Sequence, residues 1–164
     1  MEMLIIALAD WLVIPIAVVA AGALLFYVPH SKKIAVYSRL LVAGLTSYMV
    51  AKFMALAYQP STMRPFEIAG AAPGASYLDN PGFPSDHTLF VWVIVFAVWY
   101  GVRKPWLAAV LALAALAVSL GRVAALVHAP IDIIGGFVAA AVGAIWYYGA
   151  RQPKKDESLQ KSQK

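Results

Sequence analysis

The 164-residue chain contains no cysteine, and only 13% of its residues are charged. The absence of cysteine excludes disulfide frameworks, thiolate zinc sites, iron–sulfur clusters and cysteine nucleophiles. In soluble domains about a quarter of the residues are charged. Here the charged residues are few, 62% of the residues are hydrophobic, and the mean hydropathy is +0.75. This composition indicates an integral membrane protein.

Five apolar stretches are candidates to cross a bilayer as helices, because a hydrocarbon core about 30 Å thick needs roughly 20 helical residues. They cover residues 3–28, 34–58, 85–102, 105–127 and 131–150. The sequence therefore predicts an all-α bundle of about five transmembrane helices. We expect a single domain over 1–150 and a polar, flexible cytoplasmic tail over 151–164. Residues 59–84 are rich in Pro, Gly and Ala, so we do not expect them to continue a helix.

Basic residues are distributed unevenly over the ends of these spans. Ten of the 13 lie on one side, which the positive-inside rule assigns to the cytoplasm. They are Lys32, Lys33, Arg39, Arg103, Lys104, Arg151, Lys154, Lys155, Lys161 and Lys164. This pattern predicts a multi-pass protein of the plasma (inner) membrane, with the N-terminus outside and the C-terminus inside. The other three, Lys52, Arg64 and Arg122, map to the outer side, where topology gives no reason for them.

These three cations share the outer side with several other polar residues, which indicates a site for an anion. Guanidinium groups bind phosphate oxygens in a bidentate fashion, so the cations predict a phosphate or diphosphate ligand. Ser85 opens the third span, where it could donate its hydroxyl to the anion or cap the helix. The free N–H groups of that helix start would also favour an anion.

Two histidines on the same side could supply chemistry. A neutral imidazole can attack phosphorus, and a protonated one can donate a proton to the departing oxygen. His128 is the candidate nucleophile, because Asp132 lies four residues further on and can hold the other ring nitrogen if the chain turns there. His87 is then the candidate general acid. Asp10 receives no role beyond packing against a polar group near the outer interface.

Each residue of this set also has a plain structural interpretation. Lys52 could extend to the outer interface, and Arg64 could pair with Glu67 or with a lipid head group. His87 could face water at the head groups. Arg122, His128 and Asp132 could form a structural cap between two helices. The convergence of separate segments on one membrane side favours the catalytic interpretation, because charges near membrane depth are costly.

Three strings in this set resemble the signature motifs of the type 2 phosphatidic acid phosphatase (PAP2) superfamily, which also includes vanadium haloperoxidases. They are Arg64-Pro65, Pro84-Ser85-Asp86-His87 and Arg122-x5-His128-x3-Asp132. The resemblance implies a PAP2/haloperoxidase-like helical core and a metal-independent lipid phosphatase without a cofactor, acting through a phosphohistidine intermediate. It assigns His128 as nucleophile, Asp132 as its orienting partner and His87 as general acid. It assigns phosphate binding to Lys52, Arg64, Ser85 and Arg122.

The motifs also depart from the usual family pattern. Lys52 lies twelve residues before Arg64, whereas the family's first motif usually places its Lys seven residues before, where this chain has Ala57. Asp86 replaces the usual Gly of the second motif, and Gly121 replaces the usual Ser of the third. The Pro-Ser-Asp-His form is similar to that of the BcrC-type undecaprenyl diphosphate phosphatases, which recycle the carrier lipid of cell-wall synthesis. Asp86 is therefore a candidate specificity residue.

The expected substrate is a polyprenyl diphosphate such as undecaprenyl diphosphate. Phosphatidate, phosphatidylglycerophosphate and lipid A phosphate are alternatives, because the headgroup chemistry is common to all of them. A membrane protein that binds lipid phosphates without turnover is the alternative of a different class. A soluble haloperoxidase is disfavoured by the five apolar spans, and membrane lipids rather than nucleic acid are the expected partners.

Overall fold

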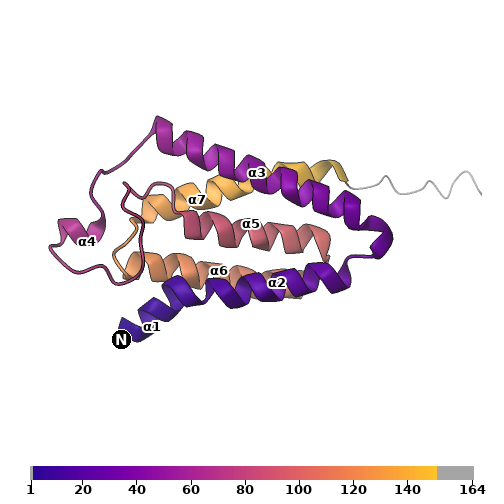
Figure 1. The fold of residues 1–164 in the computed structure, drawn as a ribbon, viewed down its shortest axis with the longest axis horizontal. Helices are drawn as coiled ribbons and strands as arrows, with labels where there is room; N and C mark the ends of the chain where they lie inside the picture. Colours follow the sequence, from indigo (N-terminus) through magenta and orange to yellow (C-terminus); the bar gives the residue numbers. More distant parts are fainter. Residues whose placement is uncertain (1, 151–164) are drawn as a thin grey trace, which may run out of the picture.

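The computed structural model describes residues 2–150, which form a bundle of helices (Figure 1). In chain order the elements are α1 (Glu2–Ile6), the π-helical η1 (Ala7–Trp11), α2 (Val13–Tyr27), the 3-10 turn η2 (His30–Lys32), α3 (Lys33–Ala57), α4 (Pro65–Ile68), α5 (Asp86–Gly101), α6 (Pro105–Ala124), α7 (Pro130–Gly143) and the 3-10 segment η3 (Ala144–Ala150). The all-α class predicted from the sequence is confirmed. The predicted tail over 151–164 lies outside the described residues.

Within the described part of the chain, four helical stretches are long and apolar enough to cross a membrane. They are Glu2–Tyr27, His30–Ala57, Pro105–Ala124 and Pro130–Tyr148. The third predicted span is the helix α5, which is apolar but has 16 residues, fewer than the roughly 20 of a full crossing. It lies in the middle of the bundle, with α3 and α7 on one side and α2 and α6 on the other (Figure 1). The five predicted spans are thus four long helices around one short central helix.

The core of the bundle is built from small and β-branched side chains. Val91 and Val98 of α5 are fully buried, and they pack in one cluster with Ala115 and Val118 of α6. Large apolar side chains point outward instead, as Phe53 of α3 does with 72% of its surface exposed. Outward-facing apolar side chains are what a helix needs when lipid rather than water surrounds the bundle.

The two ends of the bundle differ in character. The connections η2 and 103–104 lie at one end, and they carry basic residues of the predicted cytoplasmic side. The long connection 58–85, the element α1 and the turn 125–129 lie at the other end (Figure 1). Both α5 and α7 begin at this second end, so their N-termini face the same region.

The structure differs from the prediction in two places near the cavity. The fourth span was expected to run to Val127, but α6 ends at Ala124. The chain then turns, with Leu126 at a φ of 59°, and this turn carries His128. Residues 59–84 were expected to be non-helical, but they contain the one-turn helix α4. It begins at Pro65, in a position where the fixed φ of proline favours a helix start.

Candidate active site

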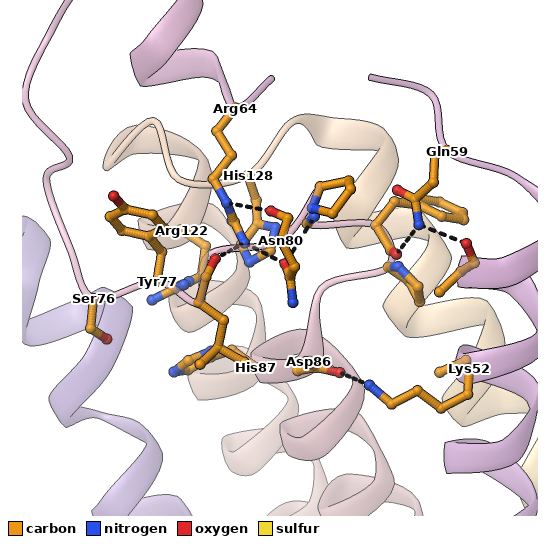
Figure 2. A pocket seen from close by; sticks show the side chains of 17 residues that line it. Lys52, Gln59, Arg64, Ser76, Tyr77, Asn80, Asp86, His87, Arg122 and His128 are labelled. Carbon is orange, nitrogen blue, oxygen red and sulfur yellow. Dashed lines mark hydrogen bonds and ion pairs between the residues drawn. The ribbon is translucent and has the colours of Figure 1, made fainter. Parts of the chain in front are cut away.

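A cavity of about 390 Å³ opens at the end of the bundle where α5 and α7 begin (Figure 2). Residues from α3, α5, α6, the 125–129 turn and the long connection line it. Six of the eight predicted site residues are among them, namely Lys52, Arg64, Asp86, His87, Arg122 and His128. The other two, Ser85 and Asp132, are buried. Segments far apart in the sequence therefore meet around one cavity.

His128 and Asp132 form a buried pair beside this cavity. Nδ1 of His128 lies 3.3 Å from Oδ2 of Asp132, and each side chain is less than a tenth exposed. The same Oδ2 accepts a hydrogen bond of 2.9 Å from the backbone N–H of Ala129, which fixes the carboxylate at the start of α7. With Nδ1 held by Asp132, the other ring nitrogen of His128 is the one available for chemistry.

Burial lowers the pKa of His128 below its usual range, because the charged imidazolium loses its hydration. The hydrogen bond to Asp132 opposes this shift, and the positive charges of Arg122 and Arg64 add to it. The net effect is a neutral imidazole near neutral pH, which is the form that can act as a nucleophile.

Ser85 joins the second motif to the third. Its backbone N–H donates a 2.9 Å hydrogen bond to the carbonyl oxygen of Asp132. Its hydroxyl oxygen accepts from the N–H of Thr88 at 3.4 Å, so Ser85 caps α5. Ser85 is fully buried and does not line the cavity, whereas His87, in the first turn of α5, does. Of the two functions that the sequence suggested for this hydroxyl, the structure contains the cap.

Arg64 is held by backbone and amide oxygens rather than by a carboxylate. Its Nε donates to the carbonyl of Asn80 at 3.1 Å, and its Nη2 donates to the carbonyl of Leu78 and to the side chain of Asn80. Its Nη1 donates to the carbonyl of Val127. Four of the five guanidinium N–H groups are thus used, and one on Nη1 is left for a ligand. The carboxylate of Glu67 accepts from the backbone N–H of Arg64 instead.

Arg122 is almost fully buried at the cavity wall, and its partner is Asp10. Its Nη1 lies 2.6 Å from Oδ1 of Asp10, while its Nε has no hydrogen-bond partner within the described residues. Sequence reasoning gave Asp10 no role at this site. The signal was present, since an acid within an apolar span is itself unusual, but its partner could not be named without the fold.

Lys52 and Asp86 form an ion pair of 3.6 Å at the more open side of the cavity, where each side chain is about half exposed (Figure 2). The ammonium group of Lys52 also lies 5.1 Å from the ring centre of Tyr48. Lys52 thus reaches the cavity despite its displaced position in the sequence. The acid that replaces the usual glycine of the second motif has a physical explanation, because it balances this lysine.

Sequence reasoning also missed residues that hold the long connection in place. The side chain of Gln59 donates to the carbonyls of Ala55 and Phe83, so it links the end of α3 to the second motif (Figure 2). Asn80 accepts from Arg64 and from the N–H of Gly82 at 3.1 Å. A single Gln or Asn in a loop does not show from the sequence alone which backbone groups its side chain will bind. Among the described residues, no group of three or more His, Asp or Glu could hold a metal ion.

Comparisons with known proteins place the chain in a family. The model of the PAP2 superfamily matches residues 32–156, a range that contains all three motifs and covers more than half of the chain. No curated protein and no solved structure matches the chain. The chain belongs to the PAP2 superfamily, and this membership indicates phosphatase activity.

Proposed function

We propose that this membrane phosphatase removes the terminal phosphate of a polyprenyl diphosphate, with undecaprenyl diphosphate as the substrate. The observation that carries the proposal is the buried pair of His128 and Asp132 at a cavity that Arg64 and Arg122 also line. The Pro-Ser-Asp-His form of the second motif supports the choice of a diphosphate lipid.

In the proposed reaction, His128 is the nucleophile. Its free ring nitrogen attacks the terminal phosphorus, and the bond between that phosphorus and the bridging oxygen breaks. His87 donates a proton to the bridging oxygen, and the lipid leaves as a monophosphate. Water then attacks the phosphohistidine with His87 as the base, which releases inorganic phosphate and restores His128. Asp132 keeps the ring oriented through Nδ1 in both steps.

Charge stabilisation in this proposal comes from groups already fixed in place. Arg122 and the remaining N–H of Arg64 face the transferred phosphoryl group, and the first turn of α5 adds free N–H groups. Lys52 lies at the more open side of the cavity, where the second phosphate of a diphosphate would sit. Because Asp86 pairs with Lys52, it weakens the attraction between Lys52 and that phosphate. We propose this effect as the role of Asp86 in specificity.

We further propose that residues 1–150 act as one domain in the plasma membrane, with the cavity on the extracytoplasmic side. The basic connections η2 and 103–104 lie at the opposite end of the bundle, which supports this orientation. An outward-facing site suits a carrier lipid whose diphosphate form is released outside the cytoplasm.

Phosphate release by the purified protein in detergent, with excess chelator, tests the proposal. Undecaprenyl diphosphate and phosphatidate are compared side by side, and His128→Ala is the blank. We expect release from the diphosphate, little from phosphatidate, and loss of at least about a hundredfold in His128→Ala, because the nucleophile is lost while the cationic cavity stays.

Other outcomes of this assay discriminate between the alternatives. Preference for phosphatidate, phosphatidylglycerophosphate or a lipid A phosphate would keep the reaction but overturn the substrate. Near-normal turnover by His128→Ala would overturn the mechanism. Absence of release from every lipid would favour a lipid-phosphate-binding protein without turnover.

A further inference from the structure

Asp10 lies in a part of the chain that neither the motifs nor the family match includes. The matched range begins at residue 32, whereas Asp10 belongs to the first apolar helical stretch. It lies in η1, where the helix widens to a π turn. The described helical stretches that could cross a membrane contain three acidic residues. Glu2 stands at a helix end and Asp132 lies in a first turn, whereas Asp10 lies well inside its stretch. Such a residue needs a partner.

The carboxylate of Asp10 joins three elements at the cavity. Its Oδ1 lies 2.6 Å from Nη1 of Arg122, near the end of α6. Its Oδ2 accepts a 2.9 Å hydrogen bond from the backbone N–H of Ser76, in the long connection. The side chains of Arg122 and Asp10 are 1% and 19% exposed. The contact is therefore a shielded ion pair, not a surface pair that water would weaken.

The backbones of the two helices are shaped for this contact. In η1 the N–H of Leu12 bonds to the carbonyl of Ala7, and this wider spacing shifts the side chains of the turn. The α6 helix approaches the turn at Gly121, where a Cβ atom would lie 3.0 Å from the backbone nitrogen of Ala9. A side chain at 121 would push the two backbones apart. Glycine directly before Arg122 thus lets Asp10 reach the guanidinium.

We infer that Asp10 is a positioning residue for Arg122: by binding Nη1 it fixes the plane of the guanidinium and offsets part of its charge at the phosphate site. The inference rests on the proposed function. Because a guanidinium is planar, holding one nitrogen orients the others, and Nε of Arg122 is left without a protein partner in the described residues. The carboxylate also weakens the attraction between the cavity and the phosphate product.

The test uses the purified full-length protein in detergent with the variant Asp10→Asn, which keeps the size of the side chain and removes its charge. We expect kcat to fall about tenfold, because Arg122 is less well oriented toward the transition state. We expect inorganic phosphate to bind about threefold more tightly, measured both by competitive inhibition and by calorimetry without substrate, because one positive charge is no longer offset. Asp10→Glu is expected to restore phosphate binding to the wild-type value.

Two controls separate positioning from a structural role. Asp79→Asn makes the same change of charge in the exposed part of the long connection, and we expect it to leave kcat and phosphate binding unchanged. In an Arg122→Gln background, Asp10→Asn is expected to change phosphate binding less than twofold, because the group through which it acts is gone.

Several results would overturn the inference. Phosphate binding that is unchanged or weaker in Asp10→Asn would do so, as would an equal response of Asp79→Asn. A parallel loss of kcat, phosphate binding and thermal stability would indicate a merely structural role. The calorimetric measurement requires no turnover. If the wild-type protein released no phosphate from any lipid, the proposed function would fail. The calorimetric binding data would still show whether Asp10 acts on phosphate binding through Arg122.

Discussion

At the residue scale, the cations of the site are already engaged by the protein itself. Lys52 is paired with Asp86, Arg122 with Asp10, and Arg64 with carbonyl and amide oxygens. The sequence suggested three cations available to bind a phosphate or diphosphate. In the folded chain two of them have acidic partners, so the positive charge offered to a ligand is smaller. Binding of an anion therefore depends more on how the unpaired N–H groups of the two arginines are oriented.

The lowered pKa of His128 predicts where the rate falls on the acid side of its pH profile. The nucleophile must be neutral, so the rate should fall when the pH drops through the pKa of His128. Burial places this value below the ordinary imidazole value of about 6.5. The hydrogen bond that His128 donates to Asp132 raises the pKa of His128, so Asp132→Asn should move the acid limb of the pH profile to still lower pH. We also expect the maximal rate to fall at least about a hundredfold, because the ring loses its orienting partner.

The measurement is the dependence of kcat/KM on pH for the wild-type protein, Asp132→Asn and Asp79→Asn. The last variant also removes a carboxylate, but an exposed one, and should leave the acid limb where it is. A limb that moved to higher pH in Asp132→Asn would contradict the assignment of the titrating group to His128.

At the scale of elements, the close approach of α7 to α5 holds the second and third motifs together. A Cβ atom at Gly136 would lie 2.6 Å from the carbonyl oxygen of Ser85 and 3.0 Å from the backbone nitrogen of Leu89. The contact is therefore between backbones, and Gly136 makes it possible. The hydrogen bond from Ser85 to the carbonyl of Asp132 lies at the same junction.

Gly136→Ala should separate the two helices and loosen the site. We expect a loss of about 1–3 kcal/mol of stability, because the atoms in the way are backbone atoms that cannot rotate aside. Activity should fall with it. The measurement is the midpoint of thermal unfolding in detergent, with Gly22→Ala as the matched control, since a Cβ there would have no neighbour within 4 Å. Equal midpoints for the two variants would show that α7 and α5 can move apart without cost.

At the scale of the whole molecule, the bundle has one basic end, and the cavity lies at the other end. The proposed orientation follows from this polarity, because basic connections favour the cytoplasmic side. In that orientation the cavity faces outward, together with the long connection that lines part of it.

The natural absence of cysteine makes the orientation directly testable. We expect a membrane-impermeant maleimide to label Ala72→Cys, an exposed position of the long connection, in intact cells. Ser31→Cys, exposed in η2 at the opposite end, should be labelled only after permeabilisation. The reverse pattern would place the cavity on the cytoplasmic side.

The site was predicted from the spacing of residues within the three motifs. The fold was predicted from the hydropathy of the long stretches. The apolar stretches indicated the helices, because a segment surrounded by lipid must satisfy its backbone hydrogen bonds internally, as a helix does. The three motifs named several residues of the cavity wall, among them Arg64, His87 and His128. The contacts of Asp10, Gln59 and Asn80 could not be predicted, because each depends on which distant backbone or side chain lies within about 3 Å of it.

The composition and the spacing of polar residues were enough to establish the class of the protein and the chemistry available to it. Composition requires a membrane bundle, and two histidines with an aspartate four residues after one of them allow phosphoryl transfer. The ion-pair partner of each cation, in contrast, depends on how the helices pack. Whether an arginine binds a ligand, a carbonyl oxygen or an acid is set by helix packing. Here packing at Gly121 brings Asp10 to Arg122.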